Sequence, residues 1–81
     1  MSKYDALHEY LRRKATSRVT LSFKDVEGII GDALPRSARE RRAWWANDRT
    51  HVEAQAWLAA GWQSASVSLV EERVTFFRAE T

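Results

Sequence analysis

Three short sequences, each with a hydroxyl residue followed three positions later by an acidic residue, divide this chain into short helices. They begin at Ser22, Ser37 and Thr50. In such a capping box the hydroxyl accepts a hydrogen bond from a backbone N–H of the first helical turn, and the acidic side chain reaches back to the cap. The three sequences therefore predict helices over residues 22–30, 37–46 and 50–60.

Apolar periodicity supplies the remaining elements. Tyr4, Leu7 and Leu11 fall at helical spacing and predict a helix before the first capping sequence. A short β-branched run and a strictly alternating segment predict strands. These elements are a helix at 3–14, a strand at 19–21 and a hairpin with strands at 64–69 and 74–77 joined by a tight turn at 71–72; residues 79–81 are predicted to fray.

The order of these elements predicts an α+β fold that resembles a winged helix. Four helices, a short strand and a C-terminal β-hairpin form one domain over residues 1–81, of the kind that binds nucleic acid. A winged-helix domain runs helix, strand, helix, recognition helix and hairpin, so this chain adds one helix before the hairpin. A helical bundle capped by a small three-stranded sheet would produce the same order.

The composition excludes several kinds of chemistry. The chain has no Cys, only two His, no glycine-rich phosphate loop and no G-x-S-x-G or H-E-x-x-H sequence. We therefore expect no catalytic residue, no metal site and no cofactor, and we do not expect an enzyme. The absence of Cys and of a long apolar run predicts a cytoplasmic protein that does not enter a membrane. His8, on the apolar face of the first helix, is interpreted as a hydrogen-bonded residue at the core boundary.

Basic residues concentrate in the first part of the chain. Residues 1–49 hold 11 Lys and Arg against 7 Asp and Glu, whereas residues 50–81 hold 2 against 4. Most of the basic residues are Arg, whose forked guanidinium suits phosphate oxygens and guanine edges. The alternative is that these Arg side chains solvate the surface and pair with nearby carboxylates. Charge alone does not choose between the two interpretations.

The densest cluster of Arg residues surrounds a Trp pair in the predicted third helix. Arg39 and Arg42 are three apart and share a helix face, while adjacent Trp44 and Trp45 diverge by roughly 100°. We expect Trp57 in the core and at least one of the Trp pair partly exposed, where it could stack on a base. The candidate nucleic-acid-binding residues are Arg36, Ser37, Arg39, Arg41, Arg42, Trp44, Asn47 and Arg49.

Ser37 has one predicted role, whereas Asn47 and the Trp pair have competing interpretations. Ser37, at the predicted helix start, would add its hydroxyl and neighbouring backbone N–H groups to a phosphate contact. Asn47 could hydrogen-bond an adenine in the major groove, but it more simply forms a turn with Asp48. The Trp residues could equally be core side chains covered by Arg stems.

Several stretches resemble a small uncharacterised prokaryotic domain family. The sequences Arg-Ala-Trp-Trp-Ala-Asn-Asp at 42–48 and Gln-Ala-Trp-Leu-Ala-Ala-Gly-Trp at 55–62 carry the resemblance. The starts and turns at 4–7, 34–39 and 74–78 also fit, so the resemblance covers nearly the whole chain. Such domains occur alone or attached to nuclease and restriction-type proteins, which implies work on nucleic acid. The resemblance assigns no activity and no site residue.

These observations favour a DNA-binding domain, a regulator or accessory module in a phage or defence context. Its third helix would present the Arg residues to double-stranded DNA. The alternative is a protein-interaction module, such as an antitoxin-like or phage-encoded inhibitor, with an exposed Trp and Arg at the centre of its interface. The two differ in salt dependence, because phosphate contacts weaken steeply with salt. The sequence does not give the oligomeric state.

Overall fold

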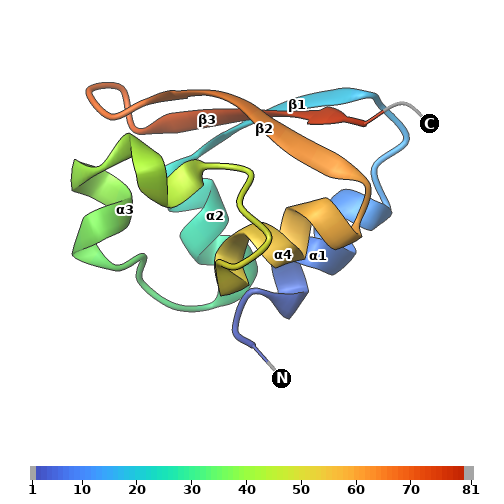
Figure 1. Ribbon diagram of the computed structural model, residues 1–81, viewed down its shortest axis with the longest axis horizontal. Helices are drawn as coiled ribbons and strands as arrows, with labels where there is room; N and C mark the ends of the chain where they lie inside the picture. Colours follow the sequence, from blue (N-terminus) through green and yellow to red (C-terminus); the bar gives the residue numbers. More distant parts are fainter. Residues whose placement is uncertain (1, 80–81) are drawn as a thin grey trace.

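The structure, a computed structural model, describes residues 2–79 as a three-stranded sheet with helices packed beneath one face (Figure 1). In chain order the elements are α1 (Asp5–Arg12), β1 (Arg18–Ser22), α2 (Phe23–Ile30), α3 (Arg36–Glu40), the 3₁₀ turn η1 (Arg42–Trp45), α4 (Val52–Ala59), β2 (Trp62–Ser68) and β3 (Arg73–Arg78). The sheet is antiparallel in the order β1-β3-β2, so β1 and β2 are its edges. The predicted α+β class is confirmed.

The start and end of α2 match the sequence prediction in detail. The Asp25 backbone N–H donates to the Ser22 hydroxyl over 2.8 Å, and the Ser22 N–H donates to the Asp25 carboxylate over 3.0 Å. Both halves of the capping box are therefore formed. Gly31 closes the helix in the left-handed conformation, with φ of 71°, which a residue without a Cβ adopts at no steric cost.

The predicted third helix is wrong in both its start and its length. Pro35 occupies the N-cap, with φ of −66° and ψ of 157°, and Ser37 lies inside α3 without a capping bond. The helix ends at Glu40. Arg41 follows with an extended backbone (φ −132°, ψ 120°), and the chain resumes as η1. This break turns the chain back so that the Trp45 indole N–H donates to the Ala38 carbonyl over 2.8 Å.

The predicted cap of the fourth helix is also wrong. His51 is the N-cap of α4 and makes no capping bond with its side chain. The Thr50 hydroxyl and N–H both donate to Asp48, over 2.6 and 2.9 Å. Thr50 therefore belongs to the preceding turn, where its N–H and its hydroxyl are both bound by the carboxylate two residues earlier. At the other end, Gly61 follows the C-cap with φ of 87°, as predicted.

The C-terminal hairpin is confirmed, with three differences in detail. β2 begins at Trp62, two residues earlier than predicted, and a register shift between Ser64 and Ser66 interrupts its alternation. The connection is a four-residue turn over 69–72 rather than a two-residue turn, and Glu72 adopts a φ of 55°. Of the residues predicted to fray, 80 and 81 lie outside the described residues.

The core is a row of aromatic rings between the helices and the sheet. Phe23 stacks on Trp45 at a centroid distance of 5.0 Å, Trp45 on Trp57 at 6.1 Å, and Trp57 meets Phe76 at 5.3 Å. Trp57 is fully buried and Trp45 nearly so, while Trp44 is half-buried. The predictions for these three Trp residues are therefore confirmed. None of the helices among residues 2–79 has the length and apolar character that a bilayer crossing requires.

Candidate nucleic-acid interface

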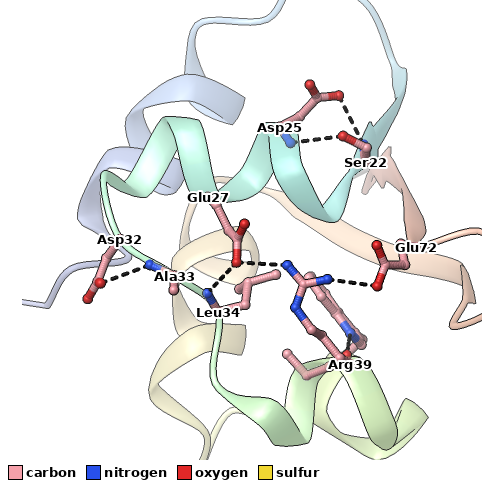
Figure 2. Close-up of polar contacts among 10 residues, drawn as sticks. Ser22, Asp25, Glu27, Asp32, Ala33, Leu34, Arg39 and Glu72 are labelled. Carbon is pink, nitrogen blue, oxygen red and sulfur yellow. Dashed lines mark hydrogen bonds and ion pairs between the residues drawn. The ribbon is translucent and has the colours of Figure 1, made fainter.

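Arg39, one of the predicted phosphate ligands, is bound by two carboxylates of its own chain (Figure 2). Its guanidinium donates to Glu27 of α2 over 2.8 Å and to Glu72 of the hairpin turn over 2.7 Å. The same Glu27 oxygen accepts the Leu34 N–H at 2.8 Å. This network joins α2, α3 and the hairpin turn, and it leaves the Arg39 side chain 34% exposed. Arg39 is thus part of the scaffold.

The electrostatics of this network follow from its hydrogen bonds. The Leu34 backbone N–H, and after it the Arg39 guanidinium, hold the pKa of the Glu27 carboxyl below its ordinary value. Hydrogen bonds from Glu27 and then Glu72 raise the pKa of Arg39 above its already high value. Both groups are therefore stabilised in their charged forms. Charge-assisted bonds of this kind hold α3 in place against the rest of the domain.

Asn47 also has partners inside the domain. Its side-chain oxygen accepts the Trp57 indole N–H at 2.9 Å and the Ser64 backbone N–H at 2.8 Å, and its amide donates to the Ser64 carbonyl over 3.0 Å. The loop before α4 is therefore pinned to the β2 edge. This use of both ends of the amide leaves it poorly placed to read a base.

The remaining Arg candidates are exposed on the same segment. Arg36 opens α3 with a side chain that is 86% exposed, and its Nε lies 3.7 Å from Glu40. Arg41, Arg42 and Arg49 are exposed and form no ion pair with any carboxylate of residues 2–79. Three guanidinium groups between α3 and α4 therefore have no acidic partner within the described part of the chain.

A small hollow adjoins one of these guanidinium groups. It has a volume of about 190 Å³ and lies between η1 and the β2 edge, with Arg42 and Ser66 among its lining residues. A guanidinium and a hydroxyl together suit a phosphate oxygen. No sequence pattern links Arg42 to the hairpin, because the hollow brings together residues that are distant in the chain.

Two further candidates are half-buried in the fold. Ser37 is half-buried inside α3, and its carbonyl accepts the Arg41 N–H at 2.9 Å. Trp44 packs edge-on against Trp45 at 4.6 Å and Tyr4 at 5.9 Å, so only part of its ring is accessible. His8, in contrast, behaves as predicted, since its Nδ1 lies 3.1 Å from the Ala56 carbonyl. Residues 2–79 contain no cluster of three His or acidic side chains able to hold a metal ion.

A family model described as "Domain of unknown function (DUF7662)" matches residues 4–80. No curated protein and no solved structure matches the chain significantly.

Proposed function

The chain belongs to the DUF7662 family, and we propose that it is a DNA-binding domain that contacts the phosphate backbone through a surface we call the arginine edge. This surface consists of Arg36, Arg41, Arg42 and Arg49. The observation that carries the proposal is the division among the Arg residues of this segment. Arg39 is neutralised by Glu27 and Glu72, whereas Arg41, Arg42 and Arg49 have no carboxylate partner within residues 2–79.

The order of the strands supports a winged-helix-like arrangement. The elements run helix, strand, further helices and C-terminal hairpin. The first strand pairs with the second strand of the hairpin, which gives the antiparallel order β1-β3-β2. In winged-helix proteins the helix before the hairpin enters the major groove. Here that helix, α4, carries neither Lys nor Arg. The proposed contact therefore moves to the α3–η1 segment, which lies beneath the hairpin tip (Figure 1).

Such a surface suits contact with phosphates better than reading of bases. Arg41 and Arg42 project from an extended residue and a single 3₁₀ turn rather than from a helix that could lie in a groove. Arg42 also adjoins the hollow beside Ser66, which suits one phosphate group. Backbone contacts of this kind give affinity with little sequence preference. We therefore propose an accessory module that holds duplex DNA for a partner activity.

One observation favours a protein partner as the second candidate. Val70, at the tip of the hairpin, is 95% exposed, and the ion pairs of Glu71 and Glu72 place acidic groups beside it. Both carboxylates are ion-paired, Glu71 with Arg73 and Glu72 with Arg39, so an exposed apolar side chain beside neutralised charges suits a protein surface better than a phosphate. This feature lies on the hairpin rather than on the arginine edge, so the two candidates predict different contact residues.

The test is a titration of labelled duplex DNA with wild type and an Arg41→Ala/Arg42→Ala double variant at two salt concentrations. We expect weaker binding on all sequences and a log–log salt slope smaller by about one per lost contact. The matched control is Arg12→Ala/Arg13→Ala, an adjacent exposed Arg pair on α1 whose members lie near Glu9. Circular dichroism confirms folding of all three proteins.

Two outcomes would contradict the proposal. Wild-type protein without salt-sensitive binding to any duplex would remove DNA as the partner and favour the hairpin-tip interface. Equal losses in the double variant and its control would indicate nonspecific charge attraction rather than a defined edge. In both cases Val70→Asp is the next variant, because it alters the hairpin tip and leaves the arginine edge intact.

A further inference from the structure

One edge of the sheet has backbone groups that face away from the neighbouring strand. Arg78 N–H donates to the Ser17 carbonyl and Phe23 N–H to the Glu72 carbonyl, each over 2.8 Å. These bonds bracket β1, so the antiparallel alternation turns the N–H and C=O groups of Arg18, Thr20 and Ser22 away from β3. Such an edge is a template for pairing with another strand.

Local side chains cover only part of this edge. The Ser22 N–H donates to Asp25, and the Arg18 carbonyl accepts the Thr16 hydroxyl at 3.1 Å. The N–H and C=O of Thr20 receive no side-chain bond from the residues that the structure describes. The opposite edge differs, because Asn47 bonds both the N–H and the C=O of Ser64 on β2.

A groove runs alongside the open edge. A hollow of about 580 Å³ is bounded by β1 at residues 19–21, by Lys24 and Gly28 of α2, and by Tyr10 and Lys14 at the end of α1. A second hollow of about 480 Å³ shares Tyr10 and Lys14 and continues along the outer face of α1. We call the two together the β1 groove. Its strand wall and its continuation along α1 suit an extended chain rather than a compact ligand.

Gly28 supplies an independent observation on the groove wall. It lies in the middle of α2, where Gly costs about 1 kcal/mol relative to Ala. A Cβ placed on it would meet no atom within 4 Å, so nothing in the described chain requires its absence. Glycine also allows another backbone to approach closely. The open space at Gly28 fits a chain lying against α2.

The charge of the groove points to an acidic occupant. Asp25 is engaged in the capping box, and Glu9 lies 3.1 Å from Arg12 and 3.7 Å from Arg13. Lys14 and Lys24 have no carboxylate partner among residues 2–79, and the Lys14 ammonium stands 4.9 Å from the centre of the Tyr10 ring. The groove therefore offers cations to an occupant and few free carboxylates.

From these observations we propose that the β1 groove binds an extended acidic peptide segment of a partner protein, which adds a strand to the sheet at β1. Main-chain bonds to Thr20 provide the pairing, Gly28 allows close approach, and Lys14 and Lys24 attract acidic side chains. An extended nucleic-acid strand would use the same cations, but it has no N–H and C=O ladder to match the strand edge. The proposal is independent of DNA binding at the arginine edge.

The test uses a fluorescent capped peptide of about eight residues that alternates Glu with Val, so that one face is acidic and the other apolar. We expect saturable binding by anisotropy, with amide shift changes at Arg18, Thr20 and Gly28. Gly28→Leu should weaken binding by about tenfold or more, because its side chain fills the groove. Ala59→Leu is the matched control: it adds similar bulk at an exposed α4 position that borders a different hollow.

A charge-reversal variant provides a second measurement. The Lys14→Glu/Lys24→Glu variant should no longer bind the acidic peptide and should instead bind a peptide that alternates Lys with Val. Gly28→Leu should bind duplex DNA as wild type does, which separates this groove from the arginine edge. Peptide binding unaffected by Gly28→Leu would overturn the proposal. So would a wild-type dimer in sedimentation that Gly28→Leu converts to a monomer, because a second copy would then occupy the groove.

Discussion

Residues 22–31 and residues 36–46 carry the same kind of helix-start signal, but only the first segment becomes the predicted helix. In α2 an apolar stripe of Phe23, Val26 and Ile30 is buried after the capping box. In α3 only Ala38 is buried, and the helix ends after five residues. A capping box satisfies backbone donors at one end, but burial of an apolar face supplies most of the stability of a helix in a protein.

The second segment is held by side chains instead of by helical periodicity. Trp45 inserts into the aromatic row and Arg39 bridges two carboxylates, while Asn47, directly after the segment, binds the β2 edge. These three residues have the chemistry of a binding site, yet each is engaged in the fold. The residues left for a partner are those that the fold does not use, above all Arg41 and Arg42.

The largest expected effect is loss of the aromatic anchor. Trp45→Ala should lower the free energy of unfolding by about 3–5 kcal/mol, because it removes a buried ring between Phe23 and Trp57. Trp44→Ala should cost less than half as much, since Trp44 is half-buried. Urea denaturation followed by circular dichroism measures both. Equal losses for the two variants would show that the segment does not depend on one anchor.

A smaller effect should separate the two Ser residues that begin the similar sequences. Ser22→Ala should destabilise the protein by about 1 kcal/mol, because it removes the acceptor for the Asp25 N–H. Ser37→Ala should change stability by less than about 0.5 kcal/mol, because Ser37 caps nothing and Ala favours a helix interior. A substantial decrease in the stability of Ser37→Ala, measured by chemical denaturation, would instead support the longer third helix that the sequence predicts.

The sequence predicts the fold correctly where local residue preferences and the pattern of buried apolar residues agree. The box at Ser22 and the stop at Gly31 combine a local residue preference with the buried apolar stripe of α2. The alternating apolar pattern predicts the hairpin strands, but the turn between them carries no residue preference and its length differs from the prediction. The sequence is insufficient around Arg39 and Asn47, whose partners Glu72 and Ser64 are distant in the sequence and leave no periodic signal. A run of Arg residues therefore predicts a basic segment, but only the fold separates the structural Arg from those that remain free.

The smallest expected effect concerns the charge of the Glu27 carboxyl. Its pKa is depressed in the folded protein by the Leu34 N–H and by Arg39. A depressed folded pKa contributes stability that is fully present above the ordinary Glu value near 4.5 and is lost as pH falls through the folded pKa. Wild type should therefore exceed Glu27→Gln in melting temperature at pH 7, and the difference should shrink as the pH is lowered below that value.

The matched control for this titration comes from the segment with the formed capping box. Ser22→Ala removes an uncharged acceptor, so its difference from wild type should change little over the same pH series. At pH 7 the melting temperature of a Glu27→Gln/Arg39→Met double variant should fall by less than the sum of the two single decreases, because both changes remove the same contact. A Glu27→Gln difference that stays constant from pH 7 to acid would mean that the carboxylate charge does not hold α3. The network would then stabilise this segment only by hydrogen-bond geometry.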